Sequence, residues 1–247
     1  MPSDAARPTA AMLVIGDEIL SGRTRDSNLH YLAQELTRHG LGLAEARVVS
    51  DDHDAIVAAV RALSAAHAQV FTSGGIGPTH DDVTAEAVAA AFGVPIDVRA
   101  DARALLQAHY DRSGLELNTA RLRMARIPAG ATLIDNPVSA APGFTLKNLH
   151  VMAGVPAVFE AMVASVLPTL AGGAPMLSQA LRVPRGEGDI AADLEALATA
   201  FPDLSVGCYP YQKDGAFCAQ VVVRGTDAAR LDAAMGRLAA LFPDALA

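Results

Sequence analysis

The sequence predicts an α/β fold with a mainly parallel sheet, followed by a small α+β domain. Over the first hundred residues, short apolar runs alternate with helices of about a dozen residues, which is typical of βαβ units. The stretch Ala171–Pro175 reads as a linker because it is rich in glycine and ends in proline. Beyond it the order changes to βαββα. We therefore expect one domain over residues 8–170 and a second over 176–247.

Composition indicates a globular protein with an acidic surface. Hydrophobic residues make up 51% of the 247 residues and charged residues 19%, which is enough to bury a core and argues against disorder. The formal charge is −8, from 19 basic and 27 acidic residues. A chain of this charge is a poor generic binder of nucleic acids or anionic membranes, so neither partner is predicted.

The sequence carries no sign of membrane insertion or export. No segment approaches the roughly 20 consecutive apolar residues of a membrane helix, and the first ten residues lack the apolar core of a secretion signal. A cytoplasmic location is expected. In that reducing compartment Cys208 and Cys218 should be free thiols, and pairing of Tyr211 with Phe217 would place both on one face of a hairpin.

Three strands and three helices are predicted in the first hundred residues. The strands are Ala11–Ile15, Leu43–Val49 and Ala68–Thr72. The helices begin after Asp26-Ser27, after Asp51-Asp52 and near Val83, and the first and third end at Gly40 and Gly93.

The later chain is expected to be more helical before it returns to strands. Helical spacing runs through Leu105, Leu106 and Tyr110, and then from Leu122 to Ile127. Arg121, Arg123 and Arg126 would lie on that second helix, with a solvated face favoured over contact with a phosphate. A hairpin around Lys147-Asn148, a helix from Pro156 to about Leu167, and the elements of the second domain follow: Leu177–Val183, Asp189–Ala200, Ser205–Tyr211, Ala216–Val223 and a last helix carrying Leu231 to Leu238.

Acidic pairs follow each of the first three predicted strands. They are Asp17-Glu18, Asp51-Asp52 and Asp81-Asp82. Ligands of open parallel sheets bind beyond the carboxyl ends of the strands, so these pairs are expected to converge there. Helix capping is the alternative, and it is strongest for Asp51-Asp52 and for one member of the third pair.

A glycine-rich turn precedes the third pair. Gly74, Gly75 and Gly77 would let backbone N–H groups approach a phosphate at the start of a helix, although a plain tight turn is the alternative. The turn matches neither the Walker loop nor the dinucleotide fingerprint. Two carboxylates beside a phosphate need a cation between them, so we expect Asp81 and Asp82 to bind Mg²⁺ or another divalent metal. His80 is open to four roles: metal ligand, acid or base, phosphate donor, or exposed loop residue.

Gly74–Thr84, GGIGPTHDDVT, resembles the signature of the molybdopterin-binding, MoaB/Mog-like superfamily. The similarity is greatest to the branch formed by the CinA amino-terminal domain and the corresponding domain of eukaryotic FAD synthases. Four further segments resemble that branch in order and spacing: Val14–Gly22, Asp26–Asn28, Asn136–Phe144 and Ala153–Pro156. The resemblance covers about residues 11–170, and Gly186–Ile190 and Gly207–Pro210 resemble the small domain that follows in the same branch.

The sequence departs from the branch at several points. Ser139-Ala140 stands where Gly-Thr is usual, and Met152-Ala153 replaces Leu-Pro. His80 occupies a position that is Lys in many CinA proteins but resembles the FAD-synthase branch. Neither a CinA deamidase domain nor an FAD-synthesising domain follows in the 247 residues, so neither activity is expected.

The resemblance implies a three-layer sandwich and chemistry at an adenylyl phosphate. The preferred activity is metal-dependent hydrolysis of a nucleotide diphosphate such as ADP-ribose or FAD. Adenylylation of molybdopterin and a catalytically silent ligand-binding module are the alternatives, and a homodimer or homotrimer is expected. The expected catalytic residues are Asp82, Asp81 and His80. The expected contacts to the nucleotide or pterin phosphate are Gly16, Asp17, Glu18, Asp51, Ser73, Gly74, Gly75, Gly77, Thr84, Asn136, Ser139 and Gly154.

Overall fold

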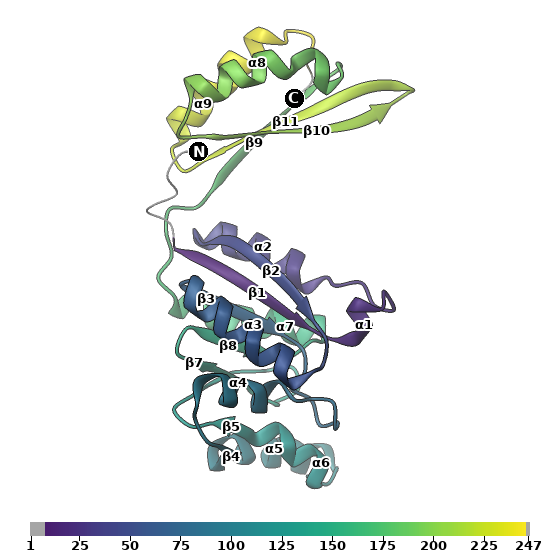
Figure 1. The fold of residues 1–247 in the computed structure, drawn as a ribbon, viewed down its shortest axis with the longest axis vertical. Helices are drawn as coiled ribbons and strands as arrows, with labels where there is room; N and C mark the ends of the chain where they lie inside the picture. Colours follow the sequence, from purple (N-terminus) through teal and green to yellow (C-terminus); the bar gives the residue numbers. More distant parts are fainter. Residues whose placement is uncertain (1–7, 246–247) are drawn as a thin grey trace. The chain divides into compact units, whose positions relative to one another are not determined.

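A computed structural model describes residues 8–245 of the chain, and the described part forms two compact units. The first unit ends at Gly173 and the second begins at Ala174. Both are drawn in Figure 1, coloured along the chain. Among the described helices, none is long and apolar enough to cross a membrane.

A mixed six-stranded sheet forms the centre of the first unit. Its order is β2-β1-β3-β8-β7-β6, where the strands are Gly42–Val49, Thr9–Ile15, Gln69–Ser73, Leu149–Met152, Gly143–Leu146 and Thr132–Ile134. The first four run parallel, and β7 and β6 complete the sheet in antiparallel fashion. The predicted α/β class with a mainly parallel sheet is confirmed.

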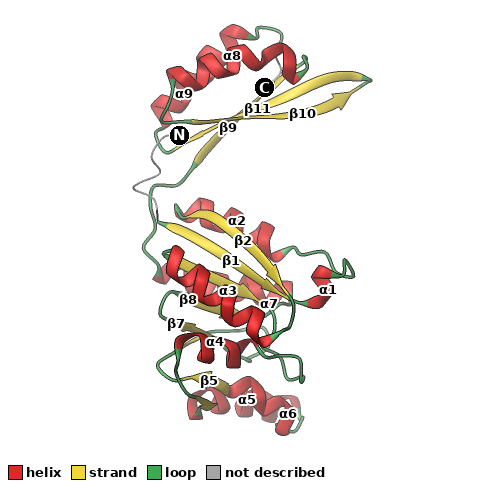
Figure 2. Ribbon diagram, in the orientation of Figure 1, coloured by secondary structure: helices red, strands yellow, loops and turns green. Residues whose placement is uncertain are grey.

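Helices cover both faces of this sheet, as the ribbon in Figure 2 shows. Helices α3 (His53–Ala66), α4 (Thr84–Phe92) and α5 (Ala100–Ser113) lie on one face, and α2 (Asn28–His39) and α7 (Pro156–Val166) lie on the other. Strand β1 is buried on both sides: Leu13 packs toward the first group of helices and Met12 toward the second. A central parallel strand of this kind needs a continuous apolar run, which is the pattern read from the sequence.

Two N-terminal helix caps and one C-terminal glycine cap form as predicted, and one N-terminal cap does not. The Asp52 carboxylate accepts from the Ala55 N–H at the start of α3, and Asp26 accepts from the Leu29 N–H at the start of α2. Gly40 ends α2 in the left-handed conformation, with φ of 80°. The expectation that Asp81 or Asp82 caps α4 is wrong, because the N-cap is Val83 and no side chain accepts a bond there among the described residues.

The predicted helix over Leu122–Ile127 is interrupted. The chain forms α6 (Thr119–Leu122), a single 3₁₀ turn η1 (Arg123–Ala125), and then strand β5 (Arg126–Pro128), which pairs antiparallel with β4 (Ile96–Val98). Pro128 supplies a physical reason, because a residue that precedes proline is disfavoured in the helical region. The side chain of that residue, Ile127, is instead buried in the core.

The second unit is a three-stranded antiparallel sheet with helices packed on one core. Its elements are β9 (Leu177–Val183), α8 (Glu187–Ala200), β10 (Ser205–Lys213), β11 (Ala216–Gly225) and α9 (Ala228–Leu241), with strand order β10-β11-β9. Val183, Val221 and Val223 pack with Ile190, Leu197, Leu231 and Leu238. The predicted small α+β arrangement is therefore observed.

The hairpin register differs from the prediction by one residue. Tyr211 pairs with Cys218 rather than with Phe217, because the turn contains only Asp214 and Gly215, both at positive φ. A one-residue shift moves a side chain to the opposite face. Cys208 lies opposite Val221 and packs against the core, so it does not share a face with Cys218, and both thiols are free.

A buried histidine in β8 gives a pH-dependent test of the fold. The His150 ring nitrogens lie 2.9 Å from Thr145 Oγ1 and 2.9 Å from Gln69 Oε1, and burial lowers the pKa of His150 to about 4. Because this pKa lies below the ordinary value of a histidine, the folded protein resists protonation that the unfolded chain accepts. Its contribution to stability is complete above about pH 6.5 and is lost as the pH falls toward 4.

We predict that His150 accounts for a loss of about 3 kcal/mol in unfolding free energy between pH 7 and pH 4. Urea unfolding across this range measures the effect. The His150→Gln variant keeps hydrogen-bonding groups but cannot be protonated in this range, so its stability should fall less than that of the wild type. Equal pH dependence of the two proteins would contradict the prediction.

Candidate functional site

The turn after β3 has no space for side chains. Gly74 and Gly75 adopt φ values of 111° and 68°, and a Cβ on them would lie 2.2 Å from the Ile15 carbonyl oxygen and 2.1 Å from Thr84 Oγ1. The Thr84 hydroxyl donates to the Gly74 carbonyl at 3.1 Å, and the Thr84 N–H donates to the Gly75 carbonyl at 3.0 Å. Glycine is thus sterically required at both positions. Thr84, the first residue of α4, holds the turn against the start of this helix.

Asp82 closes the loop that continues from this turn. Its Oδ2 accepts from the Thr79 N–H at 2.8 Å and from the Thr79 hydroxyl at 2.5 Å. A Cβ on Gly77 would lie 2.6 Å from the same oxygen. The third glycine therefore leaves room for the Asp82 carboxylate, which stabilises the loop rather than the helix.

A cavity of about 470 Å³ lies at the carboxyl ends of the parallel strands. Glu18, Asp51, Asp81 and Asp82 contribute its acidic side chains. The glycine-rich turn forms another part of the wall. The remaining lining residues come from the β6–β7 loop, from η1, from the end of β1 and from the segment after β8: Asn136, Ser139, Ala141, Met124, Ile15, Ala153, Gly154, Val155 and Val158. At least one member of each of the three acidic pairs lines this cavity, whereas Asp17 and Asp52 do not.

Crowding of the carboxylates affects the pKa of Asp51. Burial, together with the charges of Asp17, Glu18 and Asp81, raises the pKa of Asp51, although a hydrogen bond from the Asp17 N–H at 2.9 Å partly offsets this rise. An excess of negative charge in a concave site favours binding of a cation.

The loop between β6 and β7 is organised by Asn136. This side chain is only 4% exposed, and its amide group donates to Ser139 Oγ and to the Ala141 carbonyl. Its Oδ1 accepts from the backbone N–H groups of Val138 and Ser139. Asn136 therefore shapes the wall of the cavity, and Ser139 lines the cavity beside it.

Several predicted residues lie near the cavity without lining it. Gly16 and Asp17 contribute through the backbone: the Gly16 N–H donates to the Val49 carbonyl, and the Asp17 N–H contacts Asp51. Ser73 Oγ accepts a hydrogen bond from Asn28, and Thr84 is fully buried. The His80 side chain is 98% exposed, with Nδ1 4.0 Å from Asp81 Oδ1.

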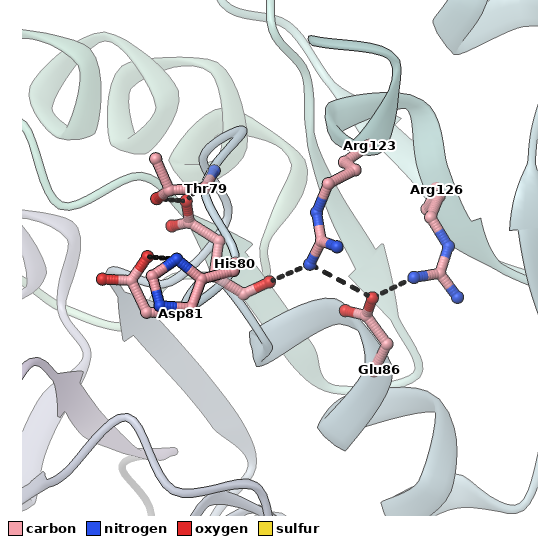
Figure 3. A network of polar contacts seen from close by, with 7 residues as sticks. Thr79, His80, Asp81, Glu86, Arg123 and Arg126 are labelled. Atoms are coloured by element: carbon pink, nitrogen blue, oxygen red, sulfur yellow. Dashed lines mark hydrogen bonds and ion pairs between the residues drawn. The ribbon is translucent and has the colours of Figure 1, made fainter. Parts of the chain in front are cut away.

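Two arginines that were expected on a solvated helix face instead form a network at the turn (Figure 3). The Arg123 guanidinium donates to the Asp82 carbonyl at 3.4 Å and lies 3.9 Å from Glu86, which also pairs with Arg126. Both arginines line a small hollow of about 20 Å³ together with Gly75, Gly77 and Asp82. The expectation is wrong because the break in the helix after Leu122 points these side chains toward α4. The sequence carried no signal of that contact.

The described part of the chain contains no preformed metal site made of protein ligands alone. Within residues 8–245, no group of three or more histidine, cysteine, aspartate or glutamate side chains is placed to hold a metal ion. Any cation at this cavity would take further ligands from water or from a bound phosphate, which is the usual behaviour of Mg²⁺.

Comparison with known families agrees with this geometry. The profile of the family described as "probable molybdopterin binding domain" matches residues 11–172, which include every residue of the cavity. The chain belongs to this molybdopterin-binding domain family. A second profile, that of the FAD synthase middle domain, matches residues 175–247. The similarity predicted from the sequence is confirmed for both units.

Two CinA-type relatives of this molybdopterin-binding domain protein agree with the assignment. A CinA-like protein of Citrifermentans bemidjiense is 39% identical over 167 residues, covering 66% of this chain and 40% of its own length. A solved CinA structure from Thermoplasma acidophilum is 34% identical with a TM-score of 0.61, covering 66% of this chain and 98% of that one. MoaB of Thermus thermophilus also matches, at 18% identity and a TM-score of 0.43, over 66% of this chain and 91% of that chain.

The chain spans between 40% and 64% of the length of four curated relatives that it matches.

The steric requirement at the turn is testable by matched glycine substitutions. Gly75 and Gly93 share a φ of 68°, but a Cβ on Gly93 has no neighbour within 4 Å among the described residues. Gly75→Ala should therefore cost at least about 2 kcal/mol more than Gly93→Ala, since both share the left-handed strain and only the first is overpacked. Chemical denaturation measures the difference.

Adding Thr84→Ala to Gly75→Ala should recover part of the loss, because it removes the oxygen that the new Cβ meets. Equal costs for the two glycine variants would show that the turn can relax and that bare backbone is not required.

Proposed function

We propose that this protein hydrolyses a nucleotide diphosphate of the ADP-ribose or FAD type at the cavity beyond β1, β2 and β3. The observation that carries the proposal is the common wall formed by four carboxylates and the glycine turn. Such a turn offers backbone N–H donors to phosphate oxygens, and the carboxylates require a cation before a polyanion can approach.

The residues present fit a divalent cation that arrives with the nucleotide. Asp51 and Asp81 line the cavity close enough to influence each other's charge, and Asp82 lies beside them with its Oδ2 held by Thr79. Asp81 and Asp82 would hold the ion, directly or through water, and water or the bound phosphate would supply its other ligands. When bound, it supplies neutralisation of the diphosphate charge and activation of a water molecule.

The chain's own groups have defined parts in the proposed reaction. Gly74, Gly75 and Gly77 orient the phosphates. Asn136 and Ser139 form another part of the cavity wall. A water oxygen attacks one phosphorus, the bond from that phosphorus to the bridging oxygen breaks, and AMP and a second phosphate ester leave. Glu18 lines the cavity and accepts the water proton, whereas His80, which the sequence offered for this step, is exposed.

A pterin phosphate is the second candidate ligand. The description of the matched family favours it directly, and the cavity's apolar residues, such as Ile15, Met124 and Val158, suit a flat ring. On this alternative the cavity binds molybdopterin, whose phosphate oxygen attacks the α-phosphorus of ATP, and pyrophosphate is released. Saturable pterin binding and pterin-dependent ATP consumption would favour it over hydrolysis.

The test is a turnover screen with ADP-ribose, FAD and ATP, each with Mg²⁺, Mn²⁺, Co²⁺ or EDTA, read by product mass. We expect AMP from a diphosphate conjugate only when a divalent metal is present. If no AMP forms under any of these conditions while a control pyrophosphatase is active, the proposed hydrolysis is wrong, and binding without turnover would identify a silent module.

Substitution of the acidic wall should separate catalysis from folding. Asp81→Asn should lower turnover by about 100-fold, because it weakens the hold on the cation. Asp54→Asn is the matched control: its side chain is 94% exposed at the start of α3 and lies outside the cavity lining. Turnover unchanged by Asp81→Asn would exclude that carboxylate from the site.

A further inference from the structure

The start of α2 contains a segment that the proposed reaction does not use. Asp26, Ser27 and Asn28 line a second hollow of about 70 Å³, together with Glu18, Thr24, Arg25, Ser73 and Gly154. Glu18 and Gly154 also line the larger cavity, so the two hollows adjoin each other. The smaller one has room for several water-sized groups.

Asn28 is held in one orientation and leaves an acceptor unused. The side chain is 6% exposed, and its amide group donates to Ser73 Oγ and to the Gly154 carbonyl, each at 2.8 Å. Because both donors of the amide are engaged, its Oδ1 is fixed as an acceptor. This Oδ1 is buried and has no hydrogen-bond partner within the described part of the chain. Buried polar atoms in native proteins are almost always paired, so a missing partner is indicated.

Asp26 repeats the pattern on the same wall. Its Oδ1 accepts from the Leu29 N–H at 3.0 Å and caps α2. Its Oδ2 is buried and, like Asn28 Oδ1, lacks a partner in residues 8–245. The unmet hydrogen-bonding capacity on this wall thus consists of two acceptor oxygens, with the Glu18 carboxylate at the boundary to the larger cavity.

We propose that this second hollow binds the vicinal hydroxyl groups of a ribose in the nucleotide ligand. A cis-diol presents two O–H donors side by side, and carboxylates are a recurrent partner of ribose hydroxyls. The edge of adenine carries both donors and acceptors. Bound here, it would place one of its acceptor nitrogens against an acceptor oxygen of Asp26 or Asn28. The inference rests on the proposed nucleotide site, since the phosphates must lie on the glycine turn for a sugar to reach Asp26 and Asn28.

Calorimetric titration in the presence of Mg²⁺ tests this subsite with three ligands: ADP, 2′,3′-dideoxy-ADP and ADP-ribose in a non-hydrolysable form whose bridging oxygen is replaced by a methylene group. The variant Asp26→Asn keeps a capping oxygen for α2 but replaces the second oxygen with a donor, and Asp26→Ser keeps the cap and removes that oxygen. Asp52→Asn is the matched control, because Asp52 caps α3 in the same way and lines neither hollow.

We expect both Asp26 variants to lower the affinity for a diol-bearing ligand by about tenfold. Their affinity for 2′,3′-dideoxy-ADP should not fall in this way. A loss for both ADP and ADP-ribose assigns the adenosine ribose, and a loss for ADP-ribose alone assigns the second ribose. The Asp52 control should change all three affinities equally.

Two results would overturn the inference in distinguishable ways. If the wild type binds nucleotides but the Asp26 variants change all three affinities equally, or change none, the ribose assignment is wrong while the phosphate site stands. If the wild type binds none of the three ligands, both the proposed function and the subsite are wrong.

Discussion

The site depends on one steric constraint, which is that the backbone after β3 must pass without side chains between Ile15 and Thr84. Gly74 and Gly75 meet this constraint, and Thr84 fixes the turn from the first residue of α4. Because the turn is pinned on both sides, its position relative to the strand ends is set by the core. Glu18 after β1 and Asp51 after β2 line the same cavity as this turn.

Charge is the second consequence of this arrangement. The parallel order β2-β1-β3 places the loops after these strands at one edge, so the charges of Glu18 and Asp81 lie close enough to act on Asp51. A fold does not gain stability from such crowding, and sites of this kind are common where a ligand or ion supplies the missing charge. Arg123 and Arg126 do not supply it directly, because Glu86 pairs with both.

Much of the first unit was predictable because its signals are local. The apolar run of β1, the cap at Asp52 and the glycine that ends α2 each act within a few residues. The interruption after Leu122 was not predicted, because the helical spacing from Leu122 to Ile127 is weak and Pro128 disfavours a helical conformation of the preceding residue. The hairpin register was missed because it depends on whether the turn holds two residues or three. The contacts of Arg123 and the unpaired oxygens of Asp26 and Asn28 are tertiary properties, and spacing alone could not indicate them.

The central claim is that a divalent cation joins the acidic wall to a polyphosphate lying on the glycine turn. Calorimetric titration of the wild-type protein with ADP, in Mg²⁺ and again in EDTA, tests it most directly. The account predicts saturable binding in Mg²⁺ and binding at least about tenfold weaker in EDTA, because uncompensated carboxylates repel the ligand. Equal affinity under both conditions would contradict it.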